Sequence, residues 1–100
     1  MKSFLCIIPA CEQEMLAYIT IKAILAVKIE SSRIRGKKEF GYFSVFIDNI
    51  SSKCVCRVIA SEDKSNINIY FPVLNRNVEA LDIDEIKDYA KYMYSSLLQL

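Results

Sequence analysis

The side chains of this chain that could do chemistry are its carboxylates, cysteines and basic residues. Histidine is absent from the 100 residues, which excludes Ser/His/Asp and Cys/His catalysis as well as histidine-ligated metal sites. The densest carboxylate cluster is Asp82, Asp84, Glu85 and Asp88, and the first three match the pattern with which a helix begins. The cluster therefore indicates a helix start rather than acid–base catalysis.

A restriction-type nuclease would need an Asp and, on a neighbouring strand, a Glu-x-Lys triplet to hold Mg²⁺. Two such triplets occur, but the one at Glu62 falls in an expected turn and the one at Glu85 opens an expected helix. No glycine-rich phosphate loop is present, since the chain contains two glycines. We therefore expect a protein that is not an enzyme and that uses no cofactor.

The four cysteines Cys6, Cys11, Cys54 and Cys56 are candidates for a four-thiolate zinc site. Neither pair has the Cys-x2-Cys spacing of zinc ribbons, and four are too few for a secreted disulfide scaffold. On a strand, Cys54 and Cys56 would share one face with diverging side chains, which favours buried thiols over a mutual disulfide. We expect reduced core cysteines and no metal.

No segment has the pattern of an export signal or of a membrane span. The apolar run of residues 4–8 is shorter than the roughly 7–15 residues of a signal-peptide core. Lys22 interrupts the next apolar stretch, so that none reaches the roughly 18 residues of a spanning helix. Together with the reduced cysteines, these patterns predict a cytoplasmic protein without membrane contact.

Basic residues gather in the middle of the chain, although the net charge is only +1. Residues 28–57 contain seven basic and three acidic residues, whereas residues 58–100 contain four basic and seven acidic ones. The densest run, residues 33–38, is expected to be a basic loop that could contact phosphates, with a merely solvated loop as the competing interpretation. Its basic side chains are Arg33, Arg35, Lys37 and Lys38.

Two helices and a sheet are expected to position these groups. With 53% hydrophobic and 25% charged residues, the chain is typical of one folded domain. Residues 11–28 read as a helix with two apolar stripes, one formed by Leu16, Ile19, Ala23 and Ala26. The second stripe is Tyr18, Ile21 and Leu25, and it is expected to meet another subunit or domain. Alternatively, the helix is wrapped by the sheet and the other helix.

Residues 33–80 show the two-residue period of an antiparallel sheet. Phe43, Val45 and Ile47 are expected to face the helices together with Ile67, Ile69 and Phe71. The opposite face would show aromatic side chains beside an arginine, as single-strand binders do and as dimer interfaces also do. The residues of this expected nucleic-acid face are Tyr42, Phe46, Arg57 and Tyr70.

Residues 82–98 are expected to form the second helix, capped by Asp82 and with Glu85 reaching back in a capping box. Its buried stripe is Ile86, Tyr89, Ala90, Met93 and Leu97, whereas Tyr92 and Tyr94 lie off the stripe as a further contact surface. With residues 1–10 as a strand or an extended lead-in, the prediction is one α+β domain. It is a two-layer sandwich in which an antiparallel meander of three to five strands is flanked by an N-terminal and a C-terminal helix.

The order of these motifs is distinctive. The motifs are Arg33-Ile34-Arg35 before an aromatic strand ending Phe46-Ile47-Asp48, then Val55-Cys56-Arg57-Val58, and the closing helix Ile83-Asp84-Glu85-Ile86-Lys87-Asp88-Tyr89-Ala90. Over residues 8–98 this order resembles the C-terminal accessory domain of predicted type I and type IV restriction-endonuclease-like proteins. The turn after Asp48 is less polar than that family's usual turn. The nuclease domain is missing, so the resemblance implies no catalytic residue.

Two functions follow as expectations. The first is a non-catalytic module for self-association or for a protein partner in restriction or phage defence, either as a stand-alone subunit or as a decoy encoded by a phage or mobile element. Its expected interface residues are Tyr18, Ile21, Leu25, Tyr92 and Tyr94. The alternative is a nucleic-acid-binding module that uses the basic loop and the aromatic sheet face.

Overall fold

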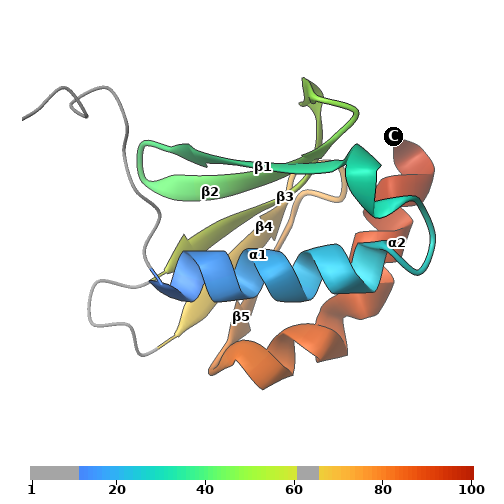
Figure 1. Ribbon diagram of the computed structural model, residues 1–100. Helices are drawn as coiled ribbons and strands as arrows, with labels where there is room; N and C mark the ends of the chain where they lie inside the picture. The colour runs from blue at the N-terminus through green and yellow to red at the C-terminus, as the bar shows by residue number, and fades with distance from the viewer. Residues whose placement is uncertain (1–11, 61–65) are drawn as a thin grey trace, which may run out of the picture.

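The computed structural model describes residues 12–60 and 66–100, in which a helix, five strands and a second helical segment follow one another (Figure 1). The predicted α+β class is therefore confirmed. The expected lead-in of residues 1–10, Cys6, Cys11 and the triplet at Glu62 lie outside the described residues. The elements are α1 (Glu12–Leu25), the 3-10 helix η2 (Ser31–Arg33), β1 (Ile34–Glu39), β2 (Tyr42–Ile47), β3 (Ile50–Ala60), β4 (Ile67–Phe71), β5 (Arg76–Ala80), the 3-10 helix η3 (Ile83–Tyr89) and α2 (Ala90–Gln99).

The sheet is an antiparallel meander in the order β1-β2-β3-β4-β5. The expectation of a basic loop at residues 33–38 is wrong, because β1 pairs along its whole length with β2, from Ile34 opposite Ile47 to Glu39 opposite Tyr42. As an edge strand it carries Lys37 and Lys38, charges that discourage pairing with a further strand.

The β2–β3 hairpin has a tight turn of two residues. Ile47 pairs with Ile50, so that only Asp48 and Asn49 form the loop. Their φ angles are 58° and 60°, the left-handed conformation that both residues of a type I′ turn adopt. Asp and Asn tolerate this region better than most residues, so the dipeptide suits the turn.

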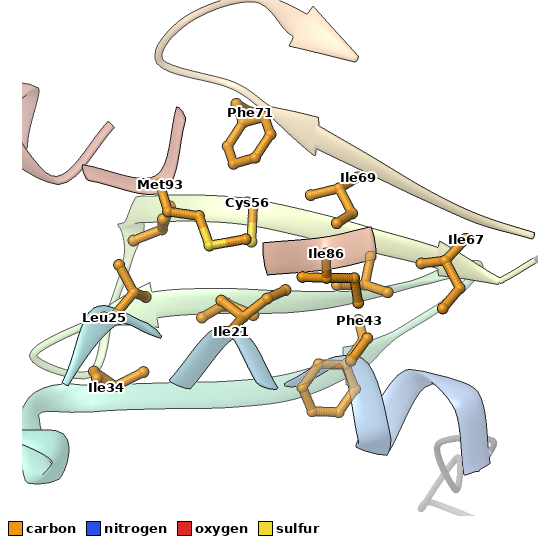
Figure 2. Close-up of a cluster of buried hydrophobic side chains, with 14 of the residues drawn as sticks. Ile21, Leu25, Ile34, Phe43, Cys56, Ile67, Ile69, Phe71, Ile86 and Met93 are labelled. Carbon is orange, nitrogen blue, oxygen red and sulfur yellow. The ribbon is translucent and has the colours of Figure 1, made fainter. Parts of the chain in front are cut away.

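One face of the sheet carries the core, covered by α1, η3 and α2 (Figure 1). The inward side chains of β2 and β4 are buried as predicted. Figure 2 shows Phe43 of β2 and the inward side chains of β4 in one cluster with Ile21 and Ile86. The strand side chains of this set are Phe43, Val45, Ile47, Ile67, Ile69 and Phe71.

The burial of the two apolar stripes of α1 is the reverse of the expectation. Ile21 and Leu25, expected at an interface with another subunit, are fully buried in the core. The stripe with Leu16 and Ile19 is exposed instead. Both stripes have helical spacing, so periodicity alone could not rank them, and contact with the sheet decides between them.

Close contact between α1 and β1 depends on Gly36. A Cβ atom there would lie 2.6 Å from Phe43 Cε1 and 2.8 Å from Tyr18 Cε1. The rings of Tyr18 and Phe43 pack together with centroids 5.1 Å apart, and they occupy the space that a side chain would fill. Gly36 therefore allows the helix to approach the edge of the sheet.

The C-terminal helical segment begins as predicted and then differs. The backbone N–H of Glu85 donates to Asp82 Oδ1 at 3.0 Å, while Glu85 Oε1 accepts from the N–H of Leu81 rather than of Asp82. The expected single helix 82–98 is η3 followed by α2, and its most buried predicted residues are Ile86 and Met93. In the described part of the chain, no helix is long and apolar enough to cross a membrane.

Candidate interaction surfaces

An apolar groove runs between α1 and the C-terminal helical segment. Ile19, Ala23 and Val27 form one wall with their neighbours on α1 and the turn after it, and Lys87 and Ala90 belong to the other. The groove has a volume of about 550 Å³. We call it the α1 groove, lined by Ile19, Thr20, Ala23, Ile24, Val27, Lys87, Ala90 and Tyr94.

Large apolar side chains stand exposed on the ridge of α1 beside this groove. Ile19 is 58% exposed and Val27, just after the helix, is 74% exposed, and Met15 and Leu16 are exposed as well. These residues were not among the expected interface residues. For Leu16 and Ile19 the sequence signal is the first apolar stripe, whereas the interface was expected at the second.

The expected interface tyrosines are all engaged within the chain. Tyr18 packs on Phe43, and the ring of Tyr92 lies 5.8 Å from that of Phe71. The hydroxyl of Tyr94 donates to the carbonyl oxygen of Ile24 at 3.1 Å, which ties α2 to α1 beneath the groove. Of the three, Tyr94 lines the α1 groove.

The outer face of the sheet brings together three of the four residues expected there. Arg57 pairs with Ser44 of β2 on one side and with Tyr70 of β4 on the other. Its guanidinium carbon lies 5.1 Å from the centre of the Tyr42 ring, a cation–π contact. The result is a row of Tyr42, Arg57 and Tyr70 across three strands.

Phe46, the fourth residue, lies on the same face but is only 7% exposed. The strand register is irregular next to Phe46. Val45 pairs with Cys56 but Phe46 pairs with Cys54, so that Val55 is an extra residue in β3 and forms a β-bulge. Since a base needs an open ring face to stack on, Phe46 cannot serve as a stacking platform in this conformation.

The same bulge corrects the expectation that Cys54 and Cys56 share a face. Cys56 joins the core, whereas Cys54 lies on the outer face with its Sγ 3.6 Å from Ser44 Oγ. Both cysteines are free and buried. Burial raises the pKa of the Cys56 thiol far above its ordinary value, so it is a structural residue rather than a nucleophile.

Three of the four basic residues at 33–38 are paired with carboxylates. Arg33 donates to both oxygens of Asp48 at 2.7 and 2.8 Å, and this hydrogen bonding lowers the pKa of Asp48 and raises that of Arg33. Lys38 Nζ lies 2.7 Å from Glu14 Oε2 on the helix side of the sheet. Lys37 Nζ lies 3.9 Å from Glu39 Oε2 in an exposed and long ion pair. Arg35 and Lys37 are both exposed on the outer side, where they can contact an anion.

No metal centre can be built from the described residues. Within residues 12–60 and 66–100, no three Cys, Asp or Glu side chains are placed to hold one ion together.

Comparison of the chain with protein families, with curated proteins and with solved structures gave no match.

Proposed function

We propose that this chain is a non-catalytic protein-interaction module that self-associates through the α1 groove. The observation that carries the proposal is the exposed apolar ridge of α1 beside an apolar groove of which α1 is itself one wall. A two-fold axis brings the same patch of both copies together, so a patch containing a ridge and a groove side by side can complement itself. Large exposed apolar patches are typical of such interfaces.

The charges along α1 favour an antiparallel arrangement of the two copies. The helix carries Glu12 in its first turn and Lys22 in its last turn. With the two α1 helices antiparallel and crossing near Ile19, the acidic start of each would lie beside the basic end of the other. In this arrangement the positive end of each helix dipole also lies near the negative end of the other, which is favourable.

The resemblance of residues 8–98 to the restriction accessory domain extends the proposal to the biological setting. It favours a partner from a restriction or phage-defence system, with the chain acting as a subunit or as a decoy that occupies that partner. The chain then acts without a catalytic step and without a cofactor. A cytoplasmic location agrees with the free thiols of Cys54 and Cys56.

Ile19→Asp tests self-association. Seating a carboxylate in an apolar interface costs about 2 kcal/mol or more, which corresponds to a rise of about thirtyfold in the dimer dissociation constant. The measurement is sedimentation equilibrium over a range of concentrations, with circular dichroism to show that the variant is folded.

Ile59→Asp is the matched control, because Ile59 is exposed in β3 on the outer side of the sheet. It should leave the dissociation constant unchanged. A wild-type chain that stays monomeric at high micromolar concentration, or equal effects of the two substitutions, would contradict self-association through the α1 groove.

A second candidate function is single-strand nucleic-acid binding on the outer sheet face. The row of Tyr42, Arg57 and Tyr70 favours it, since aromatic rings and arginine planes stack unpaired bases. Arg35 and Lys37 lie on β1, next to β2, and could contact phosphates.

Arg57→Ala is expected to weaken binding of a single-stranded oligonucleotide about tenfold, and Tyr42→Ala similarly, in fluorescence anisotropy at low salt. Lys91→Ala, which removes an exposed cation from α2, should have little effect. Affinity should fall steeply with added salt. No binding to single-stranded DNA or RNA at low salt would refute this function.

A further inference from the structure

A second cavity, which we call the end cavity, lies where α2 ends, near η2 and the start of β1. This end of the sandwich is marked C in Figure 1. The residues after α1, the β2–β3 hairpin and the last turn of α2 surround it, and its volume is about 530 Å³. Small-molecule sites are typically about 300–1,000 Å³ with a mostly apolar lining and a few polar groups. The end cavity has this size and this kind of lining.

The apolar part of the end cavity continues the core. Ile47 is almost fully buried, and Ile29, Tyr94 and Leu97 are partly buried and pack against the core cluster or close to it. These side chains come from three different segments that the fold holds together. They would receive an alkyl or aromatic group of a ligand without rearrangement of the core.

Among the described residues, every charged side chain that lines the end cavity is basic. They are Lys28, Arg33 and Lys53. Arg33 is held by Asp48, which offsets its charge and fixes its position, and Asp48 also lies within electrostatic range of Lys53. The ammonium of Lys28 lies 5.3 Å from the centre of the Tyr94 ring, at the border between the charged and the apolar lining. Lys28 and Lys53 therefore supply positive charge beside an apolar surface.

We infer that the end cavity binds a small organic anion with an apolar body, of the class of medium-chain carboxylates. The carboxylate lies with Lys28 and Lys53, and the chain covers Ile29, Ile47 and Leu97. A ligand of this class contacts both the basic and the apolar part of the lining. A free inorganic anion would leave the apolar part exposed to water. The end cavity shares only Tyr94 with the α1 groove, so this inference goes beyond self-association and does not rest on it.

Isothermal titration calorimetry with octanoate tests the inference, with octanol and octylammonium as matched ligands that lack or invert the charge. We expect one saturable site for octanoate and at least about tenfold weaker binding of both other ligands. Chemical shifts of the methyl groups of Ile29 and Ile47 should change on addition of octanoate. The same titration of the Ile19→Asp variant should give the wild-type affinity, which separates the end cavity from self-association.

The double variant Lys28→Met/Lys53→Met should weaken octanoate binding about tenfold while retaining the apolar lining. Lys37→Met/Lys91→Met removes the same charge at exposed positions outside the cavity and should bind as the wild type does. Equal affinity for octanol and octanoate, an unaffected Lys28→Met/Lys53→Met variant, or the absence of saturable binding would each overturn the inference.

Discussion

Replacing Lys38 by Met is expected to lower the free energy of unfolding by about 3 kcal/mol, a large share of the stability of a domain of this size. Lys38 Nζ contacts Glu14 Oε2 at 2.7 Å, and the two side chains are 18% and 4% exposed. Without the lysine, a buried carboxylate loses the ammonium that compensates its desolvation. Methionine keeps the unbranched aliphatic stem, so the packing changes little. Urea denaturation followed by circular dichroism measures the loss.

Two further variants make the result specific to the ion pair. Lys37→Met is the matched control on the adjacent, exposed position of β1, and it should change the stability by about 0.5 kcal/mol or less. The double variant Glu14→Leu/Lys38→Met should regain most of the loss, because a buried ion pair can be replaced by apolar groups at little cost. Equal losses in Lys38→Met and Lys37→Met would contradict a buried role for Lys38.

The same residue shows where sequence reasoning fails. Lys38 follows Arg33, Arg35 and Lys37 in a dense basic run, and a local charge count groups the four together. Strand alternation separates Lys38 from Arg35 and Lys37, and only tertiary contact with Glu14, 24 residues away, gives it a partner. The run also reads as a loop by composition, since Gly36 and charged residues are poor strand formers. Pairing with β2 overrides that local preference.

Features that depend on short-range periodicity were predictable. The inward side chains of β2 and β4 follow the two-residue period of a strand, and the cap of η3 by Asp82 depends on residues three apart. These predictions needed no knowledge of the neighbouring elements. A meander of three to five strands between two helices follows from the same patterns, because short connections between strands favour a meander. The strand β1 was not predicted, since residues 33–38 were expected to form a loop.

The faces of α1 were not predictable in this way. Both stripes are apolar and both have helical spacing, so the choice depends on which one fits the sheet. Ala17 and Gly36 are small at the contact between α1 and the sheet, and they favour burial of the stripe that contains Ile21. The expected interface residues Ile21 and Leu25 are therefore core residues, and Ile19 of the other stripe is exposed.

The outer sheet face was partly predictable, and a single bulge accounts for one of the errors. Regular alternation correctly groups Tyr42 with Arg57 and Tyr70. The extra residue Val55 in β3 then places Cys54 on the opposite face from Cys56. A bulge leaves no clear mark in this sequence, since the strand contains neither Gly nor Pro.

Ile86→Ala is expected to lower the free energy of unfolding by about 3–4 kcal/mol, as large-to-small substitutions in a closed core do. Ile86 is fully buried on η3, and Figure 2 shows it in the cluster with Ile21 and Phe43, where the sheet meets both helical segments. Truncation would leave a cavity among these side chains. For a domain of this length, the loss should lower the melting temperature by about 15 °C or more, measured by differential scanning calorimetry.

Leu81→Ala is the matched control, because it removes the same number of carbon atoms five residues earlier from a side chain that is 65% exposed. Its expected loss is about 0.5 kcal/mol, since little apolar area leaves the core. The difference between the two variants tests whether η3 packs against the sheet. Periodicity predicted η3 only as part of one continuous helix. Comparable losses in the two variants would mean that η3 does not pack with Ile86 facing the core.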